Sequence, residues 1–239
     1  MASILIIIPT FNEKENIAAI IKAVLDLPLD THVLIVDDNS PDGTSSIVED
    51  LIPLYNGRLH LIKRAGKLGL GTAYIEGFKY GLARDYQYIM EMDADFSHNP
   101  NDIERLYAAC RKEGIGMSVG SRYMKGGGFR NWSKYRLMLS YGASIYTRII
   151  TRMPVKDATA GFVMYKREVL EKMDLDKITF IGYAFQIEMK YYCHSLGFGI
   201  EEVPIIFVDR ELGTSKMNSS IIKEGIFGVL QMKFRDYSK

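Results

Sequence analysis

Short apolar segments alternate with helical patterns along the first half of the chain, and this alternation restricts the possible folds more than any other feature. Ile4–Ile8 is an unbroken run of isoleucine and leucine, as expected for a strand that is buried on both faces. The apolar residues from Ile17 to Leu25 then recur at helical spacing. Four more strands are predicted at Val33–Val36, Leu59–Ile62, Tyr88–Met92 and Met117–Val119. Strands that alternate with helices predict an α/β fold with a parallel sheet and right-handed crossovers.

The segments between these strands carry helix signals. A helix is expected from about Thr44 to Leu51, with Pro53 ending it. Another is expected over Gly71–Arg84. A third begins at Asn99-Pro100, with proline at its first position, and runs to about Lys112.

The second half of the chain changes character, but nothing in it marks a separate domain. A flexible loop is expected at Gly126–Gly128, and Ile200–Val208 is a strand that Pro204 places at a sheet edge. The other predicted elements are a long helix at Tyr135–Met153, a short strand at Phe162–Tyr165 and a helix at Tyr183–Ser195. We find no repeat, low-complexity tract or linker, so one domain of 239 residues is expected.

Charge and cysteine content exclude several classes of function. Thirty basic residues nearly balance 29 acidic ones, so the chain lacks the overall basic field of a nucleic-acid-binding protein. Any anion site must therefore be a local cluster. Cys110 and Cys193 both fall in predicted helices and form no CxxC pair, which argues against a zinc site or a disulfide framework.

The distribution of apolar residues predicts a cytoplasmic protein whose membrane contact, if any, is peripheral. Residues 1–8 are apolar, but no basic region precedes them and they run into Pro9-Thr10, which indicates a first strand and not a signal peptide. No apolar stretch approaches the roughly 20 residues that a bilayer-spanning helix needs.

Polar motifs follow three of the predicted strands, where ligands of parallel sheets bind. The sharpest is Asp93-Ala94-Asp95, between Tyr88–Met92 and Asn99-Pro100. Two carboxylates leaving a strand end can hold a divalent cation that bridges to a diphosphate. An Asp-x-Asp pair alone is common and more often caps a helix. Its place beside the strand-end motifs Thr10–Glu13 and Asp37–Asp42 favours the metal site.

The other strand ends have the composition of a nucleotide site. Asp37 or Asp38 is expected to hydrogen-bond a ribose or base, while Asp42 or Thr44 caps the following helix.

The first strand end and a later turn add candidate nucleotide contacts. Phe11 can stack on a base, and Glu13 can accept hydrogen bonds from it. Gly66–Ala73 is a glycine-rich turn before a helix, and it matches no standard phosphate-binding motif. Lys67 within it remains a plausible contact for a diphosphate.

Basic residues in the second half indicate an anion pocket. Surface lysines and arginines are usually solvated, but four that lie in turns or at element ends of a neutral chain suggest a common anion. They are Arg122, Arg136, Arg210 and Lys216. The chain has no paired histidine motif, and only His98 lies near a proposed site.

Together these motifs resemble glycosyltransferase family 2 and, within it, the dolichyl-phosphate (polyprenyl-phosphate) mannosyltransferase group. Three further segments match that group, and the resemblance extends from Ile4 to about Phe234. They are Asp157–Phe162, Gly182–Met189, and Val203–Arg210 followed by Gly213–Lys216. The resemblance implies a Rossmann-like, nucleotide-sugar-binding sheet of the GT-A type, mostly parallel with an antiparallel edge. Residues 1–123 would form the nucleotide-sugar half and residues 124–239 the acceptor half.

The resemblance also implies a role for each motif. The nucleotide sugar, GDP-mannose, would be held by Pro9, Phe11, Glu13, Val36, Asp38, Lys67, Asp93, Ala94, Asp95, Arg210 and Lys216. A Mg²⁺ or Mn²⁺ ion would be held by Asp93 and Asp95, with Gln186 nearby. The phosphate of the polyprenyl or dolichyl acceptor would be held by Arg122 and Arg136. Asp95, Arg122 and Arg136 would be the catalytic residues.

The implied reaction is a single displacement with inversion at the sugar carbon. The attacking phosphate oxygen of the lipid is ionised near neutral pH, so no general base is needed. Positioning and charge stabilisation of the leaving nucleoside diphosphate would supply the catalysis.

Three alternatives remain open on the sequence. The donor could be a UDP-sugar with the same lipid acceptor. The acceptor could be a protein or polysaccharide, which would require a base such as Asp157. The chain could be a silent nucleotide-binding subunit, against which the intact acidic and basic motifs argue.

The chain departs from its relatives at two points. Some carry glutamine where this chain has Ser97, a shorter ligand that would reach the metal through water. Many continue into membrane helices, whereas this chain ends at Lys239. Membrane contact would then come from an amphipathic surface, the lipid itself or a small anchoring partner. The candidate helices are Ser219–Arg235 and Tyr135–Met153, either of which could instead face the core.

Overall fold

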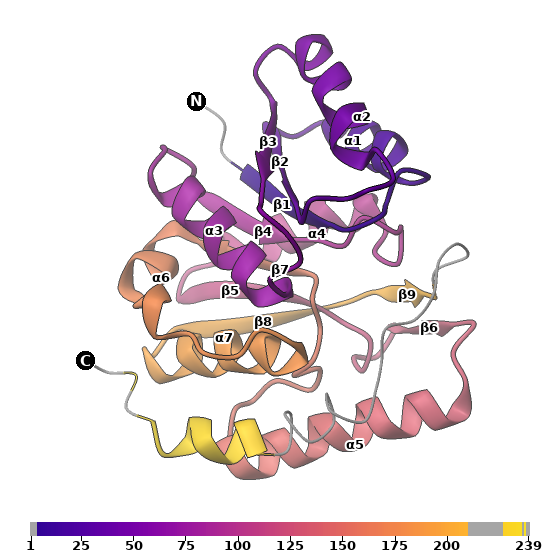
Figure 1. Ribbon diagram of the computed structural model, residues 1–239. Helices are drawn as coiled ribbons and strands as arrows, with labels where there is room; N and C mark the ends of the chain where they lie inside the picture. The colour runs from indigo at the N-terminus through magenta and orange to yellow at the C-terminus, as the bar shows by residue number, and fades with distance from the viewer. Residues whose placement is uncertain (1–3, 210–226, 236, 238–239) are drawn as a thin grey trace.

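A seven-stranded sheet runs through the molecule (Figure 1) in the order β3-β2-β1-β4-β7-β5-β8. The structure, a computed structural model, describes residues 4–209, 227–235 and 237. The strands of the sheet are β1 (Ile4–Thr10), β2 (Thr31–Asp37), β3 (Leu59–Lys63), β4 (Tyr88–Glu91), β5 (Ile115–Ser121), β7 (Val163–Lys166) and β8 (Gly199–Pro204). A separate two-stranded sheet pairs β6 (Gly128–Arg130) with β9 (Ile206–Val208).

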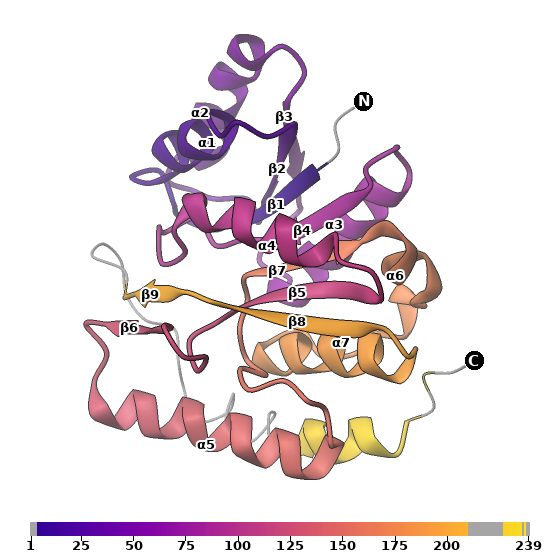
Figure 2. The same cartoon turned by 180° about the vertical axis from the view of Figure 1, so that it is seen from behind.

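Helices cover both faces of the large sheet (Figure 1, Figure 2) because side chains alternate along each buried strand. Leu5 and Ile7 pack toward α3, α6 and α7, while Ile4, Ile6 and Ile8 pack toward α1, α2 and α4. The helices are α1 (Ile17–Leu25), α2 (Thr44–Leu51), α3 (Leu70–Leu82), α4 (Ile103–Cys110), α5 (Lys134–Thr151), α6 (Arg167–Lys172) and α7 (Tyr183–Ser195). Three 3₁₀ turns lie at Ile52–Tyr55, Pro100–Asp102 and Leu175–Lys177.

The predicted mostly parallel α/β sheet is confirmed, and its antiparallel strand is β7. This strand lies inside the sheet, antiparallel to both β4 and β5, whereas we expected the antiparallel strand at an edge. Its central residues Met164 and Tyr165 are fully buried, as an internal position requires. The edge position predicted from Pro204 is correct, since β8 ends the sheet and runs parallel to β5.

Most predicted elements appear at the expected places, and the differences have local causes. The helices Thr44–Leu51 and Tyr183–Ser195 begin and end as predicted. Pro53 lies in a 3₁₀ turn that follows α2 directly, because a 3₁₀ turn accommodates proline in its first residues. Two short elements, α6 and β6, were not predicted, because six and three residues are too few for a clear period. The strand predicted over Ile200–Val208 is present as two strands, β8 and β9, which separate just after Pro204.

The long helix α5 lies along one side of the molecule, beside the helical residues 227–233 (Figure 1, Figure 2). Val229 and Met232 are buried in a small core that also contains Met153 and Val155. Among the described helices, none combines the length and apolar character needed to cross a membrane.

We expect Gly77→Ala to destabilise the protein, because α3 packs closely on β1 there. A Cβ at Gly77 would lie 2.6 Å from Cγ2 of Ile7, a rigid branch of a buried strand residue. Overpacking typically costs about 1–3 kcal/mol, and the better helix propensity of alanine returns up to about 1. We therefore expect a net loss of roughly 1–2 kcal/mol in the free energy of urea unfolding.

Gly142→Ala is the matched control, since a Cβ at this exposed position of α5 meets no atom within 4 Å. It should stabilise the protein by up to about 1 kcal/mol. Equal effects of the two substitutions would contradict the close packing of α3 on β1.

Candidate active site

The three polar strand ends meet at one edge of the sheet. Strands β2, β1 and β4 are parallel neighbours, and Thr10 and Asp37 are partners in register at their carboxyl ends. The backbone N–H of Met92, just after β4, donates to the carbonyl of Ile7. The structure therefore brings together the first, second and fourth strand-end motifs that the sequence analysis selected.

Asp37 joins two of these strand ends and is fully buried. Its carboxylate accepts hydrogen bonds from the Thr10 hydroxyl at 2.7 Å and from the Ser40 N–H and hydroxyl at 2.9 and 2.6 Å. Because three donor groups already occupy its carboxylate, Asp37 stabilises the loop after β2. Of the two neighbouring acids, Asp38 therefore remains the candidate for the nucleotide contact predicted from the sequence.

Asp42 and Thr44 hold the turn before α2. Asp42 accepts from the Thr44 N–H and hydroxyl, at 3.0 and 2.6 Å. The Thr44 hydroxyl oxygen accepts in turn from the N–H of Glu13 at 3.0 Å. These bonds connect the first and second strand-end loops, so the two residues are scaffold and Glu13 is positioned by them.

Arg64 is a residue that the sequence analysis missed. It follows β3 and is buried, with Nη1 2.9 Å from Oδ1 of Asp38 and Nη2 donating to the Thr72 hydroxyl at 2.5 Å. Burial raises the pKa of Asp38, and the Arg64 guanidinium opposes this rise. Nearby, Nζ of Lys67 lies 4.7 Å from the ring centroid of Phe11, so two predicted nucleotide residues are together. The only sequence signal for Arg64 was its place at a strand end.

Asp93 and Asp95 lie in the bend after β4, as the metal prediction requires. The Asp93 side chain is 40% exposed, and Asp95 is half-buried and accepts from the N–H of Ser97 at 3.0 Å. The described residues contain no group of three histidine, cysteine, aspartate or glutamate side chains arranged for a metal. Two partly exposed carboxylates still fit Mg²⁺ or Mn²⁺, because such ions keep water and substrate phosphate oxygens as further ligands.

The buried side chain of His98 packs next to this bend. Its ring stacks on Phe162 at a centroid distance of 4.7 Å and meets Phe207 edge-on at 5.3 Å. Burial lowers the pKa of His98 to about 4, so the imidazole is neutral near neutral pH. Nδ1 lies 4.0 Å from the Asp93 carboxylate. The ring therefore acts chiefly as packing beneath the acidic bend.

The side chain of Gln186 points to other protein groups and not to the proposed metal site at this bend. It is buried on α7, where Nε2 donates to Oε2 of Glu91 and Oε1 accepts from Nζ of Lys190 at 3.3 Å. Both polar atoms of its amide thus have protein partners beneath the strand end. We do not assign it to the metal.

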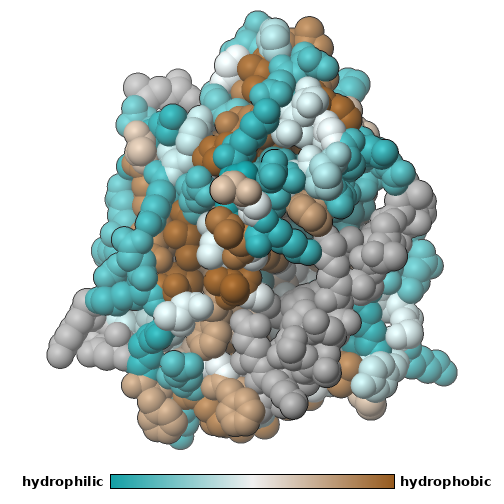
Figure 3. Space-filling view, in the orientation of Figure 1, coloured by the Kyte–Doolittle hydropathy of each residue, from teal (hydrophilic) through white to brown (hydrophobic). Residues whose placement is uncertain are grey.

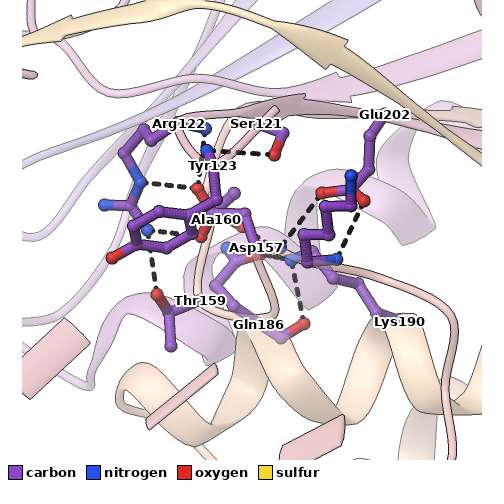
Figure 4. Close-up of polar contacts among 10 residues, drawn as sticks. Ser121, Arg122, Tyr123, Asp157, Thr159, Ala160, Gln186, Lys190 and Glu202 are labelled. Carbon is purple, nitrogen blue, oxygen red and sulfur yellow. Dashed lines mark hydrogen bonds and ion pairs between the residues drawn. The ribbon is translucent and has the colours of Figure 1, made fainter. Parts of the chain in front are cut away.

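Arg122 forms the most extensive buried ion pair of the site (Figure 4). Its Nε and Nη2 donate to the two oxygens of Asp157 at 2.7 and 2.6 Å, and its backbone N–H donates to the same carboxylate at 2.9 Å. Nη2 also donates to the Thr159 hydroxyl at 2.9 Å. The fully buried Asp157 is therefore used to orient Arg122, which argues against the general base that a protein or polysaccharide acceptor would require.

Arg136 lies against the same aromatic cluster as Arg122. The guanidinium carbons of Arg136 and Arg122 lie 4.2 and 5.3 Å from a ring centroid of Trp132. Phe129 of β6 and Phe207 of β9 complete the cluster. The structure thus brings together the two arginines predicted for the acceptor phosphate.

Two donors in this cluster point to an anion. Nη1 of Arg136 donates to both oxygens of Asp209 at 2.8 Å. Nε of Arg136 and Nε1 of Trp132 are buried and have no hydrogen-bond partner among the described residues. Buried donors are nearly always satisfied, so these two N–H groups are candidates for contact with a bound anion. Trp132 was missed from sequence because a lone tryptophan carries no motif.

Two predicted site residues, Arg210 and Lys216, lie outside the described residues. Their expected contact with the nucleotide sugar stays a prediction.

Comparison with known proteins gives a consistent result. A family model for glycosyl transferase family 2 matches residues 5–174. The polyprenol monophosphomannose synthase of Mycolicibacterium smegmatis is 45% identical over 231 residues, covering 97% of this chain and 87% of that protein. The undecaprenyl-phosphate mannosyltransferase of Micrococcus luteus is 42% identical over 226 residues, covering 95% of this chain and 92% of that protein.

Solved structures show the same architecture. Glucosyl-3-phosphoglycerate synthase from Mycobacterium tuberculosis aligns with a TM-score of 0.70 and 16% identity, over 97% of this chain and 80% of that one. That structure is a complex with Mn²⁺, UDP and glucosyl-3-phosphoglycerate. At this identity the likeness concerns the fold alone, and it confirms the GT-A type of sheet expected from the sequence.

We expect Asp157→Ala to be strongly destabilising, because it leaves the Arg122 guanidinium buried without its counter-ion. Removing one partner of a buried pair typically costs about 3–5 kcal/mol. Glu171→Ala is the control, since it breaks a surface pair with Arg167 and should cost less than about 1 kcal/mol. Urea unfolding monitored by circular dichroism measures both. Similar losses in the two variants would show that the Arg122–Asp157 pair is not a buried constraint.

Proposed function

The chain belongs to glycosyltransferase family 2, and on that premise we propose that it transfers mannose from GDP-mannose to a polyprenyl phosphate, with inversion at the sugar carbon. The observation that carries the proposal is the similarity, over nearly the whole chain, to two proteins named as lipid-phosphate mannosyltransferases. The site is consistent with it, since an acidic strand end and a two-arginine cluster lie in one domain.

In this proposal residues 1–123 bind the donor. The converging strand ends support this assignment, as does the contact between Lys67 and Phe11. The residues assigned to the nucleotide are Pro9, Phe11, Glu13, Val36, Asp38 and Lys67. Asp93 and Asp95, with Ala94 between them, are assigned to the diphosphate side and to Mg²⁺ or Mn²⁺. A divalent cation at this position would neutralise charge on the leaving nucleoside diphosphate.

The aromatic cluster in residues 124–239 is assigned to the acceptor phosphate. Arg122 and Arg136 supply positive charge, and Trp132 supplies a buried donor beside them. These groups would hold the phosphate so that one ionised oxygen faces the sugar carbon. Because that oxygen needs no deprotonation, the engagement of Asp157 with Arg122 is no obstacle to the reaction.

The test is a transfer assay with purified protein, Mg²⁺ or Mn²⁺, and a polyprenyl phosphate. GDP-mannose, UDP-glucose and other labelled nucleotide sugars are supplied in turn, and label extracted into organic solvent is counted. We expect mannose transfer from GDP-mannose. The anomeric configuration of mannose in the product should be opposite to that in the donor. Transfer from a UDP-sugar alone would overturn the donor assignment, and binding without any transfer would favour a silent subunit.

We expect substitutions at the proposed donor and acceptor sides of the site to affect different kinetic constants. Asp95→Asn should abolish transfer, as should EDTA, without unfolding the protein. Arg136→Ala should raise the KM for the lipid phosphate roughly 10- to 100-fold, because it removes a charge-assisted contact, while the Kd for GDP-mannose stays within about twofold.

Arg105→Ala is the control for Arg136→Ala, since Arg105 pairs with Asp102 on the surface of α4. It should leave both constants unchanged. A raised donor Kd with a normal acceptor KM in Arg136→Ala would move Arg136 to the donor side.

We also propose that α5 and the C-terminal helical residues contact the membrane that holds the lipid acceptor. Tyr135, Met138, Tyr141, Ile145 and Ile149 are exposed on α5, and Phe227 and Phe234 are exposed beside the buried Val229 and Met232. Figure 3 shows apolar residues along the lower rim of this face, where these helices lie.

Positive charge accompanies the exposed apolar residues of α5. Arg148 and Arg152 line a hollow of about 390 Å³ together with Ile145 and Ile149. Arginine beside exposed isoleucine suits the interface of a membrane with anionic headgroups. The membrane contact is thus assigned to α5 as much as to the C-terminal helix.

We expect the double variant Met138→Glu/Ile149→Glu to lose binding to vesicles that contain an anionic phospholipid. Transfer to a long-chain polyprenyl phosphate should fall at least about tenfold, whereas transfer to a short, water-soluble prenyl phosphate should change little. Leu54→Glu is the control, because Leu54 is 69% exposed and lies on the 3₁₀ turn after α2, away from α5 (Figure 1). Unchanged vesicle binding in the double variant would place the contact elsewhere, such as on a small anchoring partner.

A further inference from the structure

Lys190 is a fully buried lysine in the middle of α7, and it lies outside the motifs considered so far. Lysine is almost never completely buried without partners, because removing its ammonium group from water is costly. The position therefore requires contacts that satisfy all three N–H groups.

Three oxygens surround the ammonium group (Figure 4). Nζ donates to the carbonyl of Ala160 at 2.6 Å, to the carbonyl of Gln186 at 3.0 Å and to Oε1 of Gln186 at 3.3 Å. Lysine has three N–H groups, so its donor capacity is fully used.

The chain of hydrogen bonds continues to the acidic strand end. Nε2 of Gln186 donates to Oε2 of Glu91, and the Tyr165 hydroxyl donates to Oε1 of Glu91 at 2.6 Å. Glu91 is the last residue of β4 and precedes Asp93 by two residues. All these side chains are buried, so the chain of bonds crosses the interior from the sheet to α7.

The other end of this chain of bonds is the loop that orients Arg122. Ala160 belongs to the same loop as Asp157 and Thr159, which accept from the Arg122 guanidinium. Glu202 of β8 holds the beginning of the loop by accepting from the N–H of Asp157 at 3.0 Å. Side chains from β8 and α7 thus fix both ends of a segment that has no regular secondary structure (Figure 4).

We propose that Lys190, through Gln186 and Glu91, is a positioning residue that sets the Asp157–Gly161 loop, and with it Arg122, relative to the acidic end of β4. The proposal rests on the proposed function, because it takes Arg122 to bind the acceptor phosphate. Lys190 acts at a distance from the substrates. It fixes the separation between the acceptor-phosphate group and the donor site.

A lysine that only stabilised the fold would affect both substrates alike. Lys190→Met keeps the length of the side chain and removes the three donors, so the Ala160 carbonyl loses its partner. We expect the KM for the lipid phosphate to rise roughly tenfold, as for the loss of one charge-assisted hydrogen bond, and the KM for the nucleotide sugar to stay within about twofold. Equal changes in both, or no change in either, would overturn the proposal.

Tyr192→Phe is the matched control on the same helix. The Tyr192 hydroxyl is buried and accepts from the N–H of Asp174 at 2.8 Å, away from the loop. This variant should lower the melting temperature without changing the acceptor KM. An acceptor KM raised as much as in Lys190→Met would show a general effect of destabilising α7 and would overturn the proposal.

Lys190→Met leaves Glu91 as an unbalanced buried carboxylate and could fold poorly. The double variant Glu91→Gln/Lys190→Met removes both charges and should regain stability, while the acceptor KM stays high because Ala160 still lacks its donor. A normal acceptor KM in the folded double variant would overturn the proposal.

Hydrogen exchange keeps this proposal separate from the proposed function. The N–H of Arg122 donates to Asp157, so its exchange rate reports how firmly the loop is placed. We expect faster exchange at Arg122 and at residues 157–161 in Lys190→Met than in Tyr192→Phe, whatever the substrates prove to be. Equal protection in the two variants would refute the positioning role. Failure of the wild type to modify a lipid phosphate would refute the proposed function alone.

Discussion

The pairing of Arg122 with Asp157 is the constraint on which the second half of the site depends. A buried ion pair is tolerated only when hydrogen bonds replace the water that both charges lose. Here the carboxylate accepts three bonds, two from the guanidinium and one from the backbone of Arg122. That requirement places the loop after α5 against the end of β5. The aromatic cluster then forms around the guanidinium, with Trp132 and Phe207 within 6 Å of its central carbon.

The two sides of the site are built by different means. The side assigned to the donor uses the geometry of a parallel sheet, in which adjacent strands bring their carboxyl ends to one edge. Short bonds such as Thr10 to Asp37 then fasten neighbouring loops. The side assigned to the acceptor has no such repeating frame. It depends on long-range ion pairs and on the small β6–β9 sheet, which contributes Phe129 and Phe207 to the cluster.

Local patterns predicted the parallel strands and their acidic ends, because a few consecutive apolar residues are enough to indicate a buried strand. They also predicted that Arg122 and Arg136 belong to one anion site, which the shared contact with Trp132 supports. The internal position of β7 escaped prediction, because strand order depends on how the long helix α5 returns the chain to the sheet. The engagement of Gln186 with Glu91 also escaped it, since 95 residues separate the two.

The sequence by itself determined the α/β class, the sites at which strands end in carboxylates, and a family resemblance that the comparisons bear out. These properties depend on the order of residues within short segments. Only the tertiary structure decided that Asp157 orients Arg122, that Arg64 lies against Asp38, and that the buried Lys190 donates to the carbonyl of Ala160 in the loop beside Arg122. The reason is physical. The partner of a buried charge is the group that lies beside it in the folded chain, and the sequence around that charge does not indicate which group this is.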